Sequence, residues 1–352
     1  MCIFALLVNQ IKRISMKKIT IVLLMSVLLN QACDSVQDEA LRFFLRGNGH
    51  LQEYKYEDAI RFYNEALKKD STFAKVYVNR GVAYERMKQY QAAITDYTKA
   101  LQLDANLTDA YYNRSNIWFE LKKYDNALAD INKTLETYQD SSQVYVSRGT
   151  ILHKLGKVDE ALKDFEKAQA LKNTNVDAYI NRGVIYYERK EWDKAIADFQ
   201  EAIRLNPQQQ DFALNNLGLI MAERGNFSEA LSYLDKAISA NPYQAYYLSN
   251  RAYVYIQLGK LAEAAEDLKK SLSYDAQNAT AYKNQGILAM KQNNLLTAIT
   301  AFEQASQLDS TQKVYAYLTE LYSKNNNKEA ACKAYQKALV LQEPLTIQPN
   351  CK

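Results

Sequence analysis

The chain is poor in the residues that form turns, metal sites and many catalytic sites. Its 352 residues include 10 Gly, 4 Pro, 4 Cys and 2 His. So little Gly and Pro favours helices over a fold with many turns. The two histidines, His50 and His153, lie far apart, and no Cys-x-x-Cys, HExxH, phosphate-loop or G-x-S-x-G motif occurs. We therefore expect a protein that is not an enzyme and has no cofactor and no metal.

The excess of positive charge lies at the N-terminus. The chain has 44 basic and 40 acidic residues, and the segment 1–32 contributes Lys12, Arg13, Lys17 and Lys18 without any acid, which leaves 44 − 4 = 40 basic residues against 40 acidic ones. The chain after residue 32 has no net positive charge, so it lacks the electrostatic signature of nucleic-acid binding. We expect no nucleic-acid partner.

The first 32 residues have the order of a secretory signal. From Met16, two lysines precede a short apolar run that ends just before Cys33, and this run is short for a membrane-spanning helix. Its end resembles a bacterial lipoprotein signal, which implies that segment 1–32 is removed, with Met16 as the natural start. It also implies that Cys33 is lipidated and that residues 33–39 tether the protein to a membrane of the cell envelope, facing the periplasm or the surface. A plain secreted protein and an uncleaved anchor are the alternatives.

Two cysteines remain near the C-terminus. In an oxidising compartment, Cys332 and Cys351 are a candidate disulfide that would hold the last residues, 346–352, to the last helix. Two unpaired thiols are the alternative, since sequence alone does not show the geometry.

The rest of the chain repeats with a period of 34 residues. Alanine recurs at position 20 of every repeat, with Gly common at position 8 and an aromatic common at positions 4 and 24. Small and large residues at fixed places let two helices pack closely, so each repeat is expected to be a helix–turn–helix pair. One residue, Gln210, is extra, and the eighth repeat is one residue short. The nine repeats are 40–73, 74–107, 108–141, 142–175, 176–209, 211–244, 245–278, 279–311 and 312–345.

This pattern resembles the tetratricopeptide repeat, with its aromatic residues at positions 4 and 24, Gly or Ala at 8 and Ala at 20 and 27. It departs from that pattern at position 32, where only Pro207 and Pro242 provide the usual proline. The resemblance implies an all-α fold, a right-handed superhelical α-solenoid of about nine helix–turn–helix units with an inner groove.

Five repeats combine an arginine at position 7 with an aspartate at position 23. An unpaired buried charge is costly, so we expect the two to form structural ion pairs inside each repeat. Pairing with the preceding repeat fits worse, because Leu217 would then face Asp198. The pairs are Arg80–Asp96, Arg114–Asp130, Arg148–Asp164, Arg182–Asp198 and Arg251–Asp267.

Position 6 is an asparagine in most repeats. This row resembles the asparagine ladder in the repeat domain of O-linked N-acetylglucosamine transferase, which implies that each carboxamide holds the backbone of a bound peptide. Bonds to neighbouring helix ends, or simple exposure to solvent, are the alternatives. The peptide-binding candidates are Asn79, Asn113, Asn181, Asn216, Asn250 and Asn284, with Tyr112, Phe119, Tyr187, Tyr246 and Tyr253 as an aromatic lining.

The sequence therefore predicts a membrane-tethered scaffold that binds envelope proteins or peptides in its groove. One alternative is a glycan- or nutrient-binding surface lipoprotein, because exposed tyrosines can stack on sugars. The uniform repeats, without long loop insertions, weigh against it. A second alternative is a regulatory subunit of an envelope enzyme complex.

Overall fold

The computed structural model describes residues 36–351, and every regular element in this range is a helix. The first helix covers 36–52, so it begins four residues before the expected start of the first repeat (40 − 36 = 4) and includes most of the expected tether. Cys33 and the expected signal lie outside the described residues. The helices that follow are α3 (Tyr56–Lys69), α4 (Ala74–Arg86), α5 (Tyr90–Leu103), α6 (Thr108–Glu120), α7 (Tyr124–Thr137), α8 (Ser142–Lys154), α9 (Val158–Leu171), α10 (Val176–Glu188), α11 (Trp192–Leu205), α12 (Asp211–Glu223), α13 (Phe227–Ala240), α14 (Ala245–Gln257), α15 (Leu261–Tyr274), α16 (Ala279–Lys291), α17 (Leu295–Leu308), α18 (Tyr315–Lys324) and α19 (Lys328–Val340).

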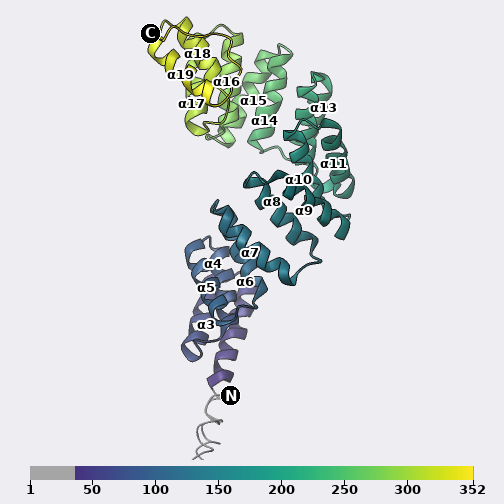
Figure 1. The fold of residues 1–352 in the computed structure, drawn as a ribbon, viewed down its shortest axis with the longest axis vertical. Coiled ribbons are helices and arrows are strands. Elements are labelled where there is room, and N and C mark those ends of the chain that lie inside the picture. The colour runs from purple at the N-terminus through teal and green to yellow at the C-terminus, as the bar shows by residue number, and fades with distance from the viewer. Residues whose placement is uncertain (1–35, 352) are drawn as a thin grey trace, which may run out of the picture. The chain divides into compact units, whose positions relative to one another are not determined.

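Consecutive helices pair as the 34-residue period predicts, for example α4 with α5 and α16 with α17 (Figure 1). The fold is an α-solenoid of about nine helix pairs. The extra residue Gln210 follows a short 3₁₀ helix, η2 (Pro207–Gln209), which joins the fifth and sixth pairs. The insertion is therefore absorbed between repeats without disturbing either helix pair.

The turn inside each repeat uses a left-handed residue at position 15. After α4, Lys88 has a φ of 59°, and the backbone N–H of Gln89 donates to the carbonyl of Tyr84. This arrangement satisfies carbonyls at the end of the first helix and turns the chain into the second. The same left-handed conformation occurs in every repeat, at Tyr54, Lys88, Lys122, Gly156, Lys190, Gly225, Gly259, Asn293 and Asn326.

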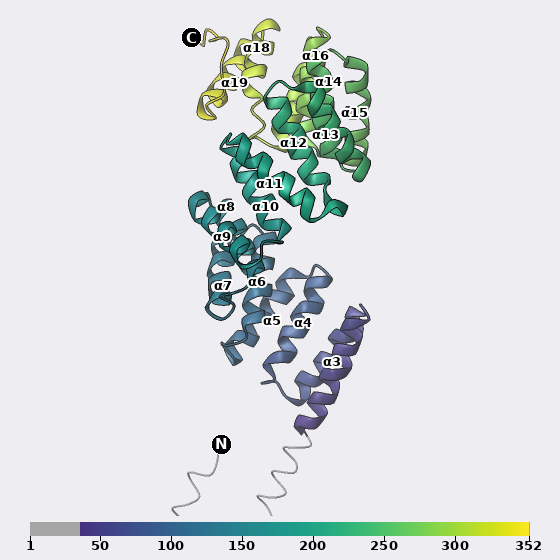
Figure 2. The same cartoon turned by 90° about the vertical axis from the view of Figure 1, so that its right-hand side faces the viewer.

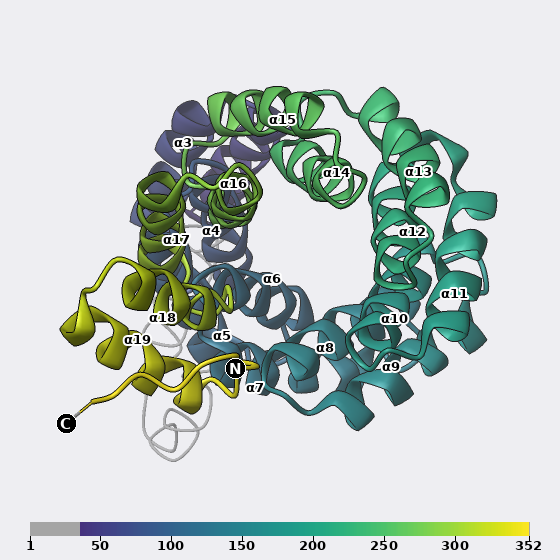
Figure 3. The ribbon, with the colours of Figure 1, turned by 90° about the horizontal axis from the view of Figure 1, so that it is seen from above.

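The structure divides into two compact units, which we call the N-terminal unit (described from residue 36 to Asp164) and the C-terminal unit (from Phe165). The boundary falls within α9. In the N-terminal unit α4 contacts α6 (Figure 2), and in the C-terminal unit α10, α12, α14 and α16 contact one another in succession. Figure 3 shows these four helices on the inner side of the C-terminal unit, with α11, α13, α15 and α17 outside them. The first helices of successive repeats thus share one surface, which we call the first-helix face.

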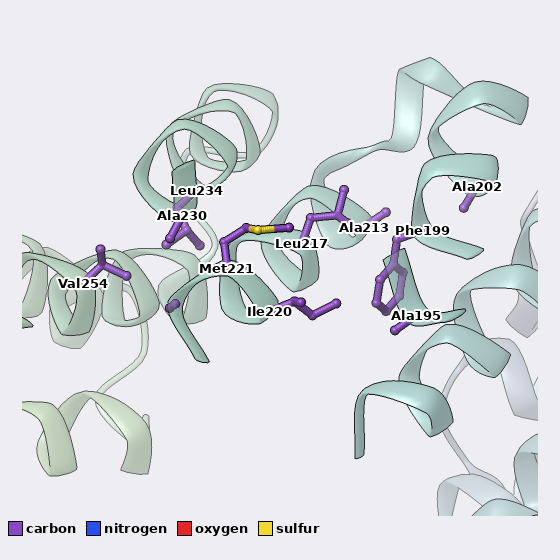
Figure 4. Packing of buried hydrophobic residues seen from close by; sticks show 11 residues of the cluster. Ala195, Phe199, Ala202, Ala213, Leu217, Ile220, Met221, Ala230, Leu234 and Val254 are labelled. Atoms are coloured by element: carbon purple, nitrogen blue, oxygen red, sulfur yellow. The ribbon is translucent and has the colours of Figure 1, made fainter. Parts of the chain in front are cut away.

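The core is continuous within each unit because small residues let the helices approach closely. The alanine at position 20 is at most 1% exposed in all nine repeats. At position 8, a Cβ added to Gly81 would lie 2.7 Å from the Tyr97 ring of the paired helix. In the C-terminal unit, Phe199, Leu217 and Val254 belong to one cluster that runs through three repeats (Figure 4). A single repeat could not bury such residues alone.

Candidate protein-binding surface

The structure brings each position-7 arginine together with the aspartate of its own repeat. Arg80 donates from Nε to Asp96 Oδ2 at 2.7 Å and from Nη2 to Asp96 Oδ1 at 2.6 Å. The aspartates are 3–5% exposed, so the bidentate geometry compensates their burial. The same two bonds join Arg114 to Asp130, Arg148 to Asp164, Arg182 to Asp198 and Arg251 to Asp267.

The arginines also reach the preceding repeat, which the sequence analysis missed. Arg80 Nη1 donates to Asn64 Oδ1 at 2.6 Å, and Arg251 Nη1 donates to Asp235 Oδ1 at 2.8 Å. Thr98 and Asn132 accept in the same way from Arg114 and Arg148. All four acceptors occupy position 25, so a polar residue 16 positions before the arginine was the available signal. These charges therefore hold the scaffold together and are not free to bind a partner.

Two asparagines face a tyrosine hydroxyl of the preceding repeat. Asn79 Nδ2 donates to Asn48 Oδ1 at 2.7 Å, and the same oxygen accepts from the Tyr63 hydroxyl at 2.8 Å. Asn113 lies close enough to the hydroxyl of Tyr97 to lower its pKa in part. Both tyrosines occupy position 24 and are buried. Their hydroxyls reach the first-helix face, where the next asparagine meets them.

The other asparagines bond elsewhere in the protein. Where position 24 of the preceding repeat is phenylalanine, the carboxamide turns back onto its own helix. Asn181 donates to the Asp177 carbonyl and Asn216 to the Phe212 carbonyl, each at 2.8 Å. Asn250 donates to Asn215 Oδ1 and Asn284 to the Ser249 carbonyl, also at 2.8 Å.

The expected asparagine ladder needs correction. Asn216 is 7% exposed and Asn284 is 3% exposed, so neither can hold the backbone of a bound peptide. The four remaining asparagines are half-buried and use their amides within the protein. Bonds to neighbouring helices, and for Asn181 and Asn216 to their own helices, therefore occupy these amides. Peptide binding by the half-buried asparagines stays a prediction.

The aromatic candidates differ in accessibility. Tyr112 and Phe119 pack partly against the core of the N-terminal unit, and Phe119 lies 5.5 Å from the Tyr124 ring. In the C-terminal unit, Tyr246 is 48% exposed. Tyr187 and Tyr253 are half-buried on the first-helix face. The aromatic lining is therefore partly core and partly surface.

Four residues on successive first helices of the C-terminal unit are linked electrostatically through Glu223, and we call them the tyrosine–lysine cluster. Tyr187 comes from α10, Glu223 from α12, Tyr253 from α14 and Lys283 from α16, one from each of four successive first helices. Burial raises the pKa of Tyr187 to about 12, with further contributions from Glu223 and Tyr253. Burial lowers the pKa of Lys283, and Lys313 adds to this effect while Glu343 and Glu223 oppose it. Glu223 is therefore within electrostatic reach of the other three groups.

Lys283 is the member of the cluster that was not predicted from the sequence. Its ammonium is half-buried, and it makes no ion pair with any residue that the structure describes. Glu223 is exposed. The cluster thus offers two aromatic rings, an available cation and a solvated carboxylate, a combination suited to the mixed apolar and polar surface of a protein segment.

The two cysteines among the described residues are bonded to each other. Cys332 on α19 is bonded to Cys351, with Cα atoms 5.6 Å apart. Between residues 36 and 351, no helix is long and apolar enough to cross a membrane. The same range contains no group of three or more His, Cys, Asp or Glu residues arranged to hold a metal ion.

Stacked helix pairs with a shared first-helix face define an α-solenoid of the helical-repeat class. Family models described as "Tetratricopeptide repeat" match residues 74–107, 176–209, 211–243 and 249–313, and one described as "TPR repeat" matches 47–88 and 149–189. The chain is therefore a tetratricopeptide-repeat protein. This fold is consistent with a protein–protein interaction scaffold.

Known relatives are similar over short stretches. The human Protein SGT1 homolog is 38% identical over 80 residues, which are 23% of this chain and 22% of that protein. Human DnaJ homolog subfamily C member 7 is 31% identical over 84 residues, 24% of this chain and 17% of that protein. The chain thus spans less than a quarter of the length of either relative. The structure titled "Crystal structure of APC/C hetero-tetramer Cut9-Hcn1" aligns with a TM-score of 0.60 and 16% identity over 86% of this chain and 73% of the other, which is a likeness of fold alone.

Proposed function

We propose that the protein is a scaffold that binds segments of other proteins on its first-helix face, and that it does so without catalysis. The observation that carries this proposal is the tyrosine–lysine cluster. Four successive repeats each supply one residue to it, and Lys283 has no ion-pair partner among the described residues. A half-buried cation without a partner costs stability, and such a cost is typical of a surface kept for a ligand.

The chemistry of the cluster indicates how a segment would bind. The rings of Tyr187 and Tyr253 supply apolar area, and their hydroxyls supply hydrogen bonds at the same place. Lys283 would pair with a carboxylate of the bound segment, so the partner segment should combine an acidic residue with apolar ones. Tyr187 is held in place by packing on Trp192, with ring centroids 5.5 Å apart. A pre-positioned aromatic loses little conformational freedom on binding.

Crosslinking and capture from intact cells test this function. The site variant replaces Tyr187, Tyr253 and Lys283 by alanine. A matched control replaces Tyr243, Tyr274 and Lys236, which are exposed on other surfaces of the same unit. We expect the wild type and the control to capture the same proteins and the site variant to lose them. Because Tyr187 and Tyr253 also pack against the core, circular dichroism checks that all three proteins are folded at the temperature of capture. Unchanged capture by the site variant would show that binding occurs on another face.

The membrane tether is a further part of the proposal. The lipoprotein-like order of residues before Cys33 supports lipidation of that cysteine and a place in the cell envelope. Because the first described helix begins at residue 36, an anchored protein would work close to the membrane surface. Metabolic labelling with a palmitate analogue tests this, with Cys33→Ala as the variant expected to lose the label. Equal labelling of Cys33→Ala would place any lipid elsewhere.

A further inference from the structure

The chain after α19 folds back onto the last repeat. Its backbone turns at Gln342, whose φ is 53°. Glu343 Oε2 then accepts a hydrogen bond from the backbone N–H of Ala316 at 2.7 Å. Leu345 packs against the apolar cluster of the last two repeats, and Cys351 is bonded to Cys332. Residues 342–351, which we call the tail, are therefore fixed at three points.

The tail occupies the place that a following repeat takes elsewhere. Inside the array, Asn284 of the eighth repeat donates to the carbonyl of Ser249, which is position 5 of the seventh. At the end of the array, Glu343 contacts Ala316, which is position 5 of the ninth repeat. The tail thus meets α18 at the position where the next first helix would meet it.

Beside the tail, α19 leaves an apolar surface open. Leu339, at position 28, is 49% exposed, whereas Leu101 and Leu135 at the same position are each 8% exposed. Leu101 is covered because it packs with Ala110 of the following repeat. Val340 is 81% exposed. The last repeat therefore has the surface that receives a following helix, which we call the end face, and the tail covers only part of it.

Without the disulfide, only weak interactions would hold the tail in place. Glu343 is 5% exposed, yet its Oε1 has no hydrogen-bond partner among the residues described. Burying a carboxylate oxygen without a hydrogen-bond partner opposes docking of the tail, and the electrostatic interaction of Glu343 with Lys283 offsets this cost in part. The disulfide keeps the tail at a high effective concentration beside α18, and cutting it removes that advantage.

We propose that the Cys332–Cys351 disulfide is a latch, and that its reduction opens the end face to an amphipathic helix of a partner protein. A dithiol supplies two electrons and two protons. The S–S bond breaks, two cysteine thiols form, and the dithiol becomes a disulfide. Glu343 of the tail also acts electrostatically on Lys283 of the tyrosine–lysine cluster. The peptide assay reports on the end face and the capture assay on the cluster, so the two proposals are tested separately.

The interior repeats show which helix fits the end face. Most receive a first helix with a small or aliphatic residue three positions before the position-6 residue, as Ala281 precedes Asn284 on α16, and the seventh repeat has the buried Tyr247 at this position. A second copy of this chain does not match. Its own first helix, 36–52, carries the exposed Arg42 where α16 has Ala281. The occupant is therefore a helix from a different protein.

A labelled peptide with the sequence of residues 278–292 serves as the probe. Its binding is measured by fluorescence anisotropy to the full chain in mild detergent, either oxidised, treated with dithiothreitol, or carrying Cys332→Ser and Cys351→Ser. We expect at least tenfold tighter binding to the reduced protein and to the double variant than to the oxidised protein. A peptide with Ala281→Arg should bind none of them.

Three results would overturn the proposal: equal peptide affinity in both redox states, equal binding of the Ala281→Arg peptide, or dimerisation on reduction in place of peptide binding. Hydrogen exchange at the Ala316 amide tests the latch without a ligand, because its protection should fall on reduction. Unchanged protection would show that the tail stays docked. A variant that ends at Leu341 should bind the peptide with or without reductant, and failure to do so would also reject the end face as the site.

Discussion

Arg114 binds Asp130 through two parallel hydrogen bonds, Nε to Oδ2 at 2.7 Å and Nη2 to Oδ1 at 2.8 Å, and both residues lie in one repeat. A third bond, from Nη1 to Thr98 at 2.9 Å, joins the arginine to the repeat before it. One side chain therefore links three helices. Its charge is largely enclosed, since the side chains of Arg114 and Asp130 are 16% and 8% exposed.

A double-mutant cycle on this pair measures the coupling free energy between the two enclosed charges. Repeat six carries Leu217 and Tyr233 at the two positions, so the matching changes are Arg114→Leu and Asp130→Tyr. Each single change should cost about 3 kcal/mol in the free energy of unfolding, because it leaves one buried charge unpaired. The double variant should cost less than either single change. Urea unfolding gives the values.

An exposed ion pair is the control for that cycle. Arg204 and Glu201 form two hydrogen bonds on the surface of α11. Replacing either by alanine should leave the unfolding curve unchanged within error, because exposed pairs contribute little. If the Arg114 and Asp130 changes proved strictly additive, the two residues would not stabilise the fold as a pair.

The left-handed turn residues make a second prediction. Lys122 has a φ of 57°, which is unfavourable for a residue with a Cβ, whereas Gly156 at the same position has a φ of 75° without strain. Lys122→Gly should raise the free energy of unfolding by about 0.5–1 kcal/mol. Gly156→Lys should lower it by a similar amount, because nothing near Gly156 would clash with a side chain. Thermal melting of both variants checks this, and a destabilised Lys122→Gly would contradict it.

Much of the fold was predictable because the period of 34 residues fixes both helices of each repeat. Alanine at position 20 marks where two helices touch, and its burial is uniform. The left-handed position was harder to see, because Tyr54 and the lysines there do not look like helix-ending residues. The partner of the position-6 asparagine depends on position 24 of the preceding repeat. The hydroxyl of Tyr97 interacts with Asn113, whereas a phenylalanine at position 24 has no hydroxyl to offer.

The candidate site was less predictable for a physical reason. Tyr187 and Tyr253 were visible as groove residues, but their accessibility depends on how neighbouring helices pack. Lys283 was not among the binding residues that the sequence predicts. Only the structure shows that Lys283 lacks an ion pair among the described residues and comes near Glu223.

Glu85 should make stability depend on pH. Burial raises the pKa of this carboxyl, and the Tyr97 hydroxyl, 2.9 Å from Glu85 Oε2, lowers it in part. A carboxyl whose folded pKa is raised adds stability at pH values below its unfolded pKa of about 4.3, and loses it as pH rises through the folded pKa. The stability of the wild type relative to Glu85→Gln should therefore fall as pH rises.

Tyr97→Phe sharpens this test. Removing the hydroxyl removes the interaction that lowers the pKa of Glu85, so that pKa should rise further and the loss of stability should extend to higher pH. Carbon-13 NMR of the Glu85 carboxyl reports the pKa directly, and urea unfolding across the pH range reports stability. A Glu85→Gln variant with the pH dependence of the wild type would assign the effect to other groups.

Lys283→Met should separate stability from binding. The substitution keeps the length and apolar stem of the side chain and removes an ammonium whose pKa burial has lowered. The free energy of unfolding should rise by about 0.5–2 kcal/mol, because the substitution removes a charge without an ion pair from a half-buried position. Capture of partner proteins should fall at the same time. Lys270→Met, at an exposed lysine paired with Glu266, is the control and should change neither property. If Lys283→Met lost stability, the lysine would serve the fold, and the case for a binding surface at this place would fail.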